Sequence, residues 1–396
     1  MSRPTVEVAD ILRVKANQFR ERYRNWLSFQ QLKVMRAITN CRTAALGGHI
    51  DVCTQCGYET GMSYNSCRDR HCPKCQAQAR QRWLERREQD LLATGYFHLV
   101  FTIPHLLNAL IIQNPRVLYN LLFAAAAATL LEVSADPKHL GARIGFISIL
   151  HTWGQNLQHH PHLHCVIPAG GLAPDHSCWI RRRDRFLLPK GVLSRVFRGK
   201  FVAGLRRAYQ QNQLRFAGPL QPLSSEKRFA AFLRTLYRHH WVVHPKPAFG
   251  GPTQVLRYLG RYTHRIAISN HRLLAFDGER VTFRWKDYAH GNKQRTMTLS
   301  AMEFLRRFLI HVLPRGFVRI RHFGFLANGH RARLLPLCRQ HLAMAPLTPA
   351  FETTIADRMR WSCPHCSGLM KVRRRLSAAE LAARHHPTSC SYFDTS

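Results

Sequence analysis

The residues most able to do chemistry in this sequence are a histidine pair and a tyrosine pair. His162 and His164 flank the apolar Leu163. On a β-strand both histidines point to one face, because side chains alternate, so they can hold one metal ion while Leu163 enters the core. Tyr258 and Tyr262 are four residues apart and share one face of a helix. A metal site together with paired tyrosine hydroxyls indicates DNA cleavage through a covalent phosphotyrosine.

Three arginines accompany the tyrosines. Arg257, Arg261 and Arg265 recur every four residues and form a second stripe beside the tyrosines on the expected helix. Guanidinium groups bind phosphates through paired hydrogen bonds. The stripe is therefore a candidate contact to the DNA backbone.

The chain is strongly basic. Of its 396 residues, 59 are lysine or arginine and 22 are aspartate or glutamate, which gives a formal net charge of +37. The excess is spread along the chain and predicts a polyanionic partner, with nucleic acid as the leading candidate. The few acidic residues form no spaced triad, which disfavours a nuclease built on three carboxylates and two metal ions.

The sequence predicts a cytoplasmic protein that does not enter a membrane. The N-terminal segment has the pattern of a charged amphipathic helix, and the most apolar stretch, residues 121–131, is too short to span a bilayer. Half of the twelve cysteines lie in Cys-x-x-Cys pairs. In a chain without secretory features, this spacing favours zinc in a reducing compartment over disulfides.

Two of the Cys-x-x-Cys pairs lie close together near the N-terminus. Cys53 and Cys56 form one pair, Cys72 and Cys75 the other, and fifteen residues separate the pairs. We expect these four thiolates to hold one structural zinc ion that stabilises a DNA-contacting surface.

Further metal ligands are available in the same block and at the C-terminus. A possible second, mixed zinc site would use Cys41, His49, Cys67 and His71. The C-terminal pair Cys363 and Cys366 forms half a site, and the residues that could complete it are Cys338, His385, His386 and Cys390.

The pattern of apolar residues predicts a mixed α+β fold. Helices are expected over residues 6–38, 77–93, 117–133, 226–239 and 300–312, besides the tyrosine helix. Strands are expected over residues 97–103, 143–151, 163–168, 241–244, 272–276 and 280–286, with a turn at Asp277-Gly278 between the last two. Hairpins mixed with helices favour an α+β domain over a doubly wound parallel sheet.

Three motifs carry a family resemblance over nearly the whole chain. They are Ser-Tyr-Asn-Ser-Cys-Arg-Asp-Arg-His-Cys-Pro-Lys-Cys at 63–75, His-Pro-His-Leu-His at 160–164 and Tyr-Leu-Gly-Arg-Tyr-Thr at 258–263. In this order they resemble the insertion sequence 91 family of rolling-circle transposases. That family belongs to the HUH endonucleases, which also include plasmid replication initiators and conjugative relaxases.

The resemblance implies three regions. Residues 1–95 would form an N-terminal helix and a zinc-ribbon-like DNA-binding domain. Residues 96–330 would form the HUH nuclease domain, an antiparallel sheet with flanking helices, and 331–396 a basic tail with a possible half zinc site. The protein would act in the bacterial cytoplasm, associated with the nucleoid.

The resemblance also implies the roles of the motif residues. His162 and His164 would bind catalytic Mg²⁺ or Mn²⁺, and Tyr258 and Tyr262 would be nucleophiles that form 5′-phosphotyrosine links with single-stranded or hairpin DNA ends of the mobile element. The class usually supplies a third polar ligand; His98, His151 and Gln155 are the candidates, of which we favour His151.

Two other functions are compatible with parts of this pattern. A plasmid-type replication initiator or relaxase would share the histidines and a tyrosine. A non-catalytic zinc protein that only binds DNA would need the histidine and tyrosine motifs to be coincidental.

Overall fold

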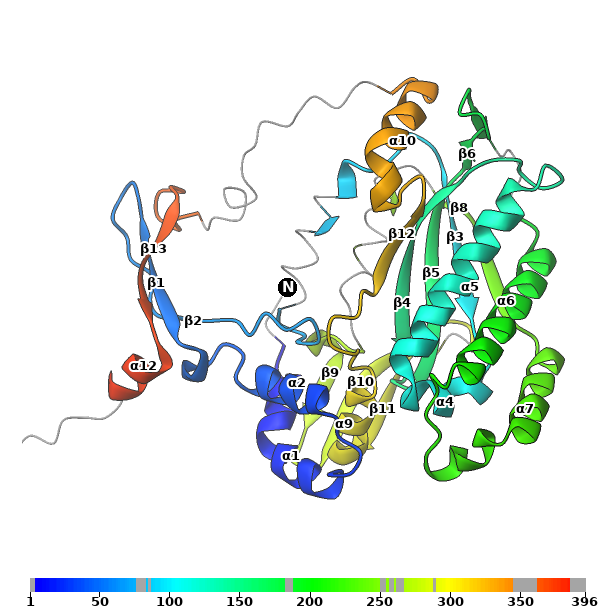
Figure 1. Cartoon of the computed structure of the whole chain (residues 1–396). Coiled ribbons are helices and arrows are strands. Elements are labelled where there is room, and N and C mark those ends of the chain that lie inside the picture. The colour runs from blue at the N-terminus through cyan, green and yellow to red at the C-terminus, as the bar shows by residue number, and fades with distance from the viewer. Residues whose placement is uncertain are drawn as a thin grey trace, which may run out of the picture.

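The centre of the molecule is a five-stranded antiparallel sheet with the strand order β12, β4, β5, β3, β8 (Figure 1). The strands are β3 (Tyr96–Thr102), β4 (Gly145–Trp153), β5 (His159–Pro168), β8 (Val242–Phe249) and β12 (Ile320–Gly324). The computed structural model describes residues 4–75, 83–84, 87–181, 188–249, 254–255, 260, 267–287, 290–344 and 362–384. The sheet and its helices confirm the expected α+β class.

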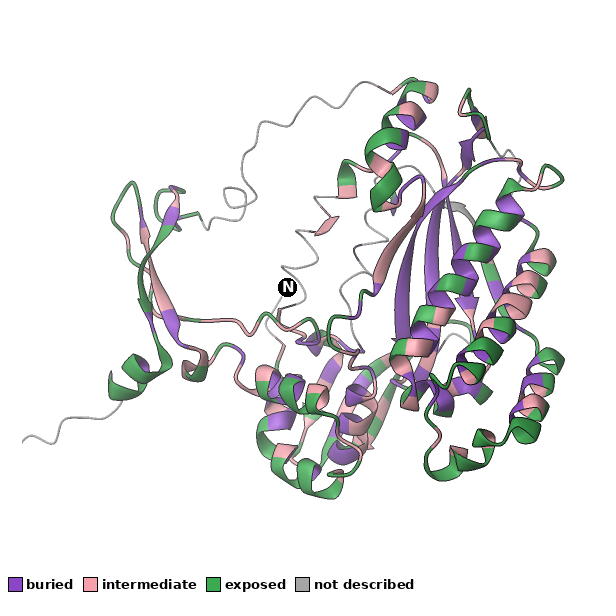
Figure 2. Cartoon of the chain, in the orientation of Figure 1, coloured by how far each residue is buried: buried purple, intermediate pink, exposed green. Residues whose placement is uncertain are grey.

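Helices cover one face of this sheet. The long helices α5 (Pro115–Ala135) and α6 (Lys190–Gln210) pack against each other and over the sheet, with α4 (Asn108–Gln113) and α7 (Glu226–Arg238) beside them. Figure 2 shows the strands buried beneath these helices. Every second strand residue enters the resulting core, which includes Phe97, Leu99, Phe101, Leu163, Cys165 and Ile167 together with Phe123 of α5 and Phe197 of α6.

Helix α5 is apolar because it is a core helix. Among the described residues it is the one helix long and apolar enough to cross a membrane, and most of it is buried. Its side chains, Leu122 and Phe123 among them, pack in the core between the sheet and α6. This packing accounts for its composition.

The opposite face of the sheet has a smaller apolar cluster. Ile147 and Ile149 of β4 and Val166 of β5 pack there with Val255 and with side chains of α10 (Asn328–His341). Helix α10 crosses the boundary expected at residues 330 and 331, and its residues Leu334 and Leu335 are buried.

The N-terminal segment forms two helices, so the expectation of one helix over residues 6–38 is wrong. Helix α1 (Val8–Arg22) ends before a turn, and α2 (Phe29–Thr39) begins at Ser28, whose side chain accepts a hydrogen bond from the Gln31 backbone N–H. The Gln31 side-chain oxygen in turn accepts a hydrogen bond from the Ser28 backbone N–H at 2.8 Å. This capping box starts a new helix, which packs beside α1.

The N-terminal helices pack on a distant part of the chain. Strands β9 (Leu273–Phe276), β10 (Arg280–Asp287) and β11 (Lys293–Ser300) form a small antiparallel sheet followed by α9 (Ala301–Leu309). Side chains of α1, α2, β9, β10 and α9 share one core, which contains Phe19, Ile38, Phe283, Phe304 and Phe308. The expected hairpin with its turn at Asp277-Gly278 is present as β9 and β10.

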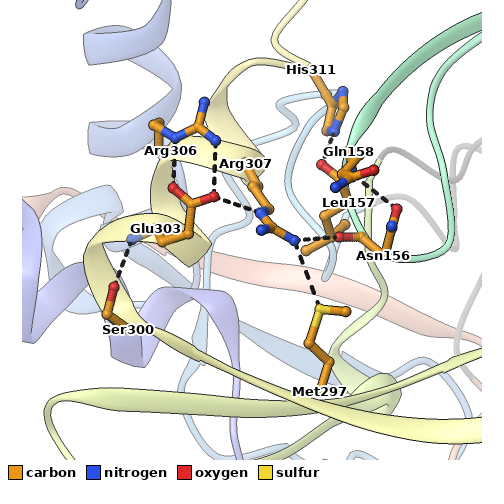
Figure 3. A network of polar contacts seen from close by, with 9 residues as sticks. All are labelled: Asn156, Leu157, Gln158, Met297, Ser300, Glu303, Arg306, Arg307 and His311. Carbon is orange, nitrogen blue, oxygen red and sulfur yellow. Dashed lines mark hydrogen bonds and ion pairs between the residues drawn. The ribbon is translucent and has the colours of Figure 1, made fainter.

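We call the segment from Arg272 to His311, which contains β9, β10, β11 and α9, the second unit. Its side chains hold the turn between β4 and β5. Three consecutive carbonyl oxygens of the turn, those of residues 155–157, accept hydrogen bonds from side chains of the second unit. Arg272 binds the first, Arg307 the second at 3.2 Å, and His311 Nε2 the third at 3.1 Å. Figure 3 shows the last two, and also Glu303, whose carboxylate holds Arg307 at 2.7 Å. The turn that orients β5 is therefore fixed from outside the sheet.

A third, separate sheet joins two strands near the N-terminus to the last described strand. Strand β1 (Gly48–Cys53) pairs with β2 (Ser63–Tyr64) on one side and with β13 (Met370–Leu376) on the other. Helix α12 (Ala378–Arg384) follows β13. In Figure 1 this sheet stands apart from the central one.

The sequence located the central strands well. The strands expected at 97–103, 143–151 and 163–168 correspond to β3, β4 and β5, and the helices expected at 117–133, 226–239 and 300–312 to α5, α7 and α9. The expected tyrosine helix lies almost entirely outside the described residues, and so do residues 77–82 and 85–86 of the helix expected at 77–93.

Gly324 provides a test of how tightly β12 is joined to β4. Its φ is +61°, and a Cβ at this position would lie 1.8 Å from the Ile144 carbonyl oxygen. Gly316 also has a positive φ, +71°, but no atom within 4 Å of a Cβ. We expect Gly316→Ala to cost about 1 kcal/mol of unfolding free energy from backbone strain alone. Gly324→Ala should cost a further ~1–3 kcal/mol because the strand must move. Equal urea midpoints for the two variants would contradict this.

His311 should make the stability depend on pH. Burial, followed by the neighbouring His159, lowers the pKa of His311 to about 3. The unfolded chain, with an ordinary histidine pKa near 6.5, binds this proton more readily, so unfolding free energy falls as the pH drops below about 6.5. For this one group the slope approaches about 1.4 kcal/mol per pH unit. Denaturant titrations between pH 6.5 and 5 should show a shallower slope for His311→Asn than for wild type. The exposed His330→Asn variant should retain the wild-type slope.

Candidate functional site

Three histidines converge on the face of the sheet opposite α5 and α6. His162 and His164 lie on β5, and His151 lies on β4 directly opposite His162 in the antiparallel register. One ring nitrogen from each histidine lies within 4.8 Å of one from each of the others. The structure thus brings together the two histidines of the motif and the third ligand that we favoured.

The alternation of β5 explains why these histidines face away from the helices. Leu163, Cys165 and Ile167 enter the core beneath α5 and α6. The residues between them must point to the other side of the sheet. The strand therefore presents His162 and His164 because its other side chains are required in the core.

Hydrogen bonds orient the two rings of the motif. The Nδ1 of His162 donates to the His160 carbonyl oxygen at 2.6 Å, so its Nε2 is the nitrogen that would face an ion. The Nδ1 of His164 lies 2.9 Å from Nε2 of His98 on β3. Burial, followed by the charge of His160, lowers the pKa of His162 to about 4. The ring is therefore neutral at pH 7, the state in which imidazole binds metals.

The other two candidates for the third ligand have different positions. His98 is fully buried on β3 and contacts His164, so it orients the His164 ring through this contact. The backbone of Gln155 lies in the β4–β5 turn, where its carbonyl oxygen accepts a hydrogen bond from Arg272. Neither belongs to the group of three.

The tyrosine motif lies outside the described residues. This applies to Tyr258 and Tyr262 and equally to the arginine stripe of Arg257, Arg261 and Arg265. Two described residues bracket the first tyrosine. Val255 is buried in the cluster with Ile149 and Val166, and a Cβ on Gly260 would lie 2.9 Å from the side chain of Leu84, which packs against the same cluster.

The cysteines form two clusters of four. The first consists of Cys41, Cys67, Cys72 and Cys75. The second consists of Cys53, Cys56, Cys363 and Cys366. The expectation that Cys53, Cys56, Cys72 and Cys75 hold one ion is therefore wrong, because the two Cys-x-x-Cys pairs belong to different clusters.

The possible mixed site of Cys41, His49, Cys67 and His71 is also wrong in its histidines. His71 uses both ring nitrogens: Nδ1 lies 2.9 Å from the Asp69 carboxylate, and Nε2 accepts the Leu313 backbone N–H at 3.1 Å. His49 pairs with Asn65 at 3.0 Å. Cys41 and Cys67 instead join the Cys72 pair.

The sulfur separations in both clusters suit zinc. In the first cluster Cys75 Sγ lies 3.5 Å from Cys41 Sγ and 3.6 Å from Cys67 Sγ. A disulfide requires about 2.05 Å. Four thiolates about 2.3 Å from a tetrahedral zinc ion lie about 3.8 Å from one another. The thiols of the first cluster are thus spaced for one tetrahedral ion, with no position left for substrate.

The comparisons with known proteins agree with this arrangement. Two family models match: "Transposase zinc-binding domain" over residues 11–103 and "Putative transposase" over residues 145–333. The "Putative transposase y4qJ" of Sinorhizobium fredii (strain NBRC 101917 / NGR234) is 52% identical over 350 residues, which is 88% of this chain and 87% of that protein. The "Transposase for insertion sequence element IS801" of Pseudomonas savastanoi pv. phaseolicola is 30% identical over 295 residues, 72% of this chain and 67% of that protein. The chain belongs to this family of transposases.

Membership in the transposase family settles the general class of activity. The resemblance to the insertion sequence 91 family is confirmed, and the transposase is a DNA-processing enzyme with a zinc-binding domain. No solved structure matches the chain.

Sequence reasoning left two features of the site unassigned. His98 was considered only as a ligand, although its contact with His164 follows from adjacent strands. Of the residues that could complete the site of Cys363 and Cys366, Cys338 is buried in the cluster around α10, and His385, His386 and Cys390 lie outside the described residues. Cys53 and Cys56 complete the group instead. The Cys-x-x-Cys spacing occurs at 53, 72 and 363, so spacing alone does not tell which two pairs share an ion.

Removing the first cysteine cluster should destabilise the transposase. Cys72 is fully buried in the core that α1, α2 and β10 share. We expect Cys72→Ser to lose the zinc of this cluster and, with it, several kcal/mol of stability, roughly 10 °C in thermal midpoint. Zinc content and thermal melting of the purified chain measure both effects. The exposed Cys178→Ser variant is the control and should keep wild-type values. Unchanged zinc content in Cys72→Ser would contradict the assignment.

Proposed function

We propose that the transposase is an HUH-type single-strand DNA endonuclease and strand transferase of the rolling-circle kind. The observation that carries this is the group of His151, His162 and His164, whose ring nitrogens converge within 4.8 Å on the sheet face opposite the helices. A cluster of imidazoles on adjacent strands, away from both cysteine clusters, suits a catalytic metal rather than a structural one.

The three histidines would hold a divalent ion, Mg²⁺ or Mn²⁺. Such an ion would polarise the scissile phosphate and neutralise charge that develops during its cleavage. Imidazole nitrogens accept Mn²⁺ more readily than the harder Mg²⁺. We therefore expect Mn²⁺ to support activity at lower concentration.

The tyrosines would supply the nucleophile. One phenol oxygen, from Tyr258 or Tyr262, attacks the phosphorus in line and loses its proton. The bond from phosphorus to the 3′ oxygen breaks, that oxygen takes up a proton, and the tyrosine keeps the 5′ phosphate. The link retains the energy of the phosphodiester, so a 3′-OH can later reverse the step and rejoin the strand without ATP. The second tyrosine would permit a second cleavage while the first link persists.

The positions of described neighbours support this role. Val255 packs with Ile149 and Val166, which lie on the same sheet face as the histidines, and Gly260 contacts the same cluster through Leu84. These two described residues on either side of Tyr258 support the assignment of the nucleophile to this motif. The arginines at 257, 261 and 265 would hold the phosphates of the DNA strand.

The expected partner is DNA from the ends of the mobile element, single-stranded or in a hairpin. A net charge of +37 favours any nucleic acid, whereas cleavage at one phosphate requires an unpaired strand that can enter the site. The reduced cysteines of both clusters agree with action in the bacterial cytoplasm, at the nucleoid.

The decisive experiment is a covalent-adduct assay. The transposase is incubated with labelled single-stranded DNA from its own element ends, with Mn²⁺, Mg²⁺ or chelator, and resolved on a denaturing gel. We expect a metal-dependent adduct that is absent from the Tyr258→Phe, Tyr262→Phe double variant. His162→Ala should slow its formation by at least about 100-fold. The exposed Tyr237→Phe variant should behave as wild type.

Two outcomes would favour the other functions. If the wild-type chain binds DNA but forms no adduct with any metal, the non-catalytic zinc protein is supported instead. If a single cleavage occurs without strand transfer between element ends, a replication initiator or relaxase is the better description.

A further inference from the structure

The second cysteine cluster joins the two ends of the described chain. The Cys53 Sγ lies 3.4 Å from the Cys366 Sγ, and the Cys56 Sγ lies 3.6 Å from the Cys363 Sγ. All four sulfurs lie within 4.8 Å of one another. The match to the zinc-binding domain ends at residue 103, so half of this cluster lies beyond it.

The first cysteine pair lies in a tight turn of defined geometry. The Cys53 backbone N–H donates to the Tyr58 carbonyl oxygen at 2.8 Å, and the Gly57 N–H donates to the Cys53 carbonyl oxygen at 3.2 Å. Gly57 has a φ of +71°. The backbone N–H groups of Gln55 and Cys56 also point at the Cys53 sulfur, at 3.4 Å and 3.5 Å.

The second pair repeats the turn. The Cys363 N–H donates to the Gly368 carbonyl oxygen at 2.8 Å, and the Ser367 N–H donates to the Cys363 carbonyl oxygen at 2.9 Å. Ser367 has a φ of +58°, a conformation that a residue with a side chain adopts only rarely. Two segments far apart in the sequence thus have the same backbone around the same Cys-x-x-Cys spacing, and both aim their thiols at one point.

Contacts between the two turns hold them face to face. Thr54 donates to the Leu369 carbonyl oxygen from both its backbone N–H, at 2.9 Å, and its hydroxyl, at 3.0 Å. The rings of Tyr58 and His365 lie 4.3 Å apart. Next to the turns, β1 and β13 pair along their full lengths, from Gly48 opposite Leu376 to Cys53 opposite Met370.

We propose that Cys53, Cys56, Cys363 and Cys366 bind a second structural zinc ion and form a zinc ribbon from the two ends of the chain. Paired turns that each present two thiolates, followed by paired strands, are the arrangement of a closed tetrahedral zinc site. The site holds β13 beside β1. The transposase then carries two zinc ions, one in each cysteine cluster.

The ribbon presents a basic strand to solvent. The five inner residues of β13, which include Lys371, Arg373, Arg374 and Arg375, are all exposed. Arg373 forms an ion pair with Glu59. Because the proposed function requires DNA, this step rests on it: the zinc fixes a row of cations that binds the DNA backbone without reading its sequence.

Zinc analysis of the full-length chain tests the metal site directly. Wild type should contain two zinc ions per chain, matching the two clusters, and the Cys363→Ser, Cys366→Ser variant should contain one. Cys178→Ser, which removes an exposed thiol outside both clusters, should retain two. Two ions in the double variant, or one ion in both it and the wild type, would overturn the proposal.

Limited proteolysis distinguishes a lost site from a misfolded variant. Trypsin should cleave wild type at the lysine and arginines of β13 only after a zinc chelator is added. It should cleave the double variant there without chelator, while fragments of the central sheet persist in both. Equal protection of β13 in wild type and double variant would contradict a zinc-held strand.

DNA affinity tests the role of the strand separately. The triple variant of Lys371, Arg374 and Arg375 to Ala should keep two zinc ions. It should bind all single-stranded sequences more weakly, with the salt dependence of affinity reduced by about one unit per contacted phosphate. Wild-type affinity and salt dependence would overturn the DNA-binding step. Covalent-adduct formation reports on the nuclease proposal independently, since none of these residues belongs to the histidine or tyrosine motifs.

Discussion

The candidate active site depends on the alternation of side chains along β5. This strand lies between β4 and β3, so its hydrogen-bonding groups are engaged on both edges. Leu163 is fully buried under the helices, and its neighbours His162 and His164 consequently face the other way. A slip by one residue would place both histidines in the apolar core and Leu163 on the site. The free energy of core packing therefore fixes the face on which the histidines lie, and no additional interaction is needed to choose that face.

The same register explains why the clamp on the β4–β5 turn matters. Three side chains from the second unit bind consecutive carbonyls of that turn, and Leu157 within it has a positive φ of +63°. The turn determines which residue of β4 lies opposite His162. Because this residue is His151, a fixed turn keeps the three candidate ligands together across two strands. The N-terminal helices stabilise the second unit through its core, so they support the site from a distance.

Sequence periodicity predicted the central strands because one face of each strand enters the core, and this alternation is visible over a few residues. It did not predict features that depend on a short capping signal or on contacts between segments far apart in the sequence. The break between α1 and α2 was encoded by Ser28 and Gln31, a capping box that the amphipathic pattern on either side obscured. The cysteine grouping was wrong because spacing indicates which thiols can share an ion and says nothing of a strand more than 300 residues away that pairs with β1. Closing such a loop costs about 5 kcal/mol in chain entropy, less than the roughly 10–16 kcal/mol of structural zinc binding. Proximity in sequence was therefore a poor guide to which thiols share an ion.

On the proposed function, histidine ligands are consistent with the charge of the whole chain. Carboxylate ligands would place negative charge where a DNA phosphate must approach, and the chain has only 22 acidic residues against 59 basic ones. His162 is kept neutral by burial, which lowers its pKa to about 4, so it can bind an ion without reducing the ion's charge. On the proposed function, the full charge of the ion then acts on the phosphate, and the basic surface holds the rest of the strand. Neutral ligands and a cationic surface are thus two parts of one electrostatic arrangement, each of which would be weakened by acidic residues at the site.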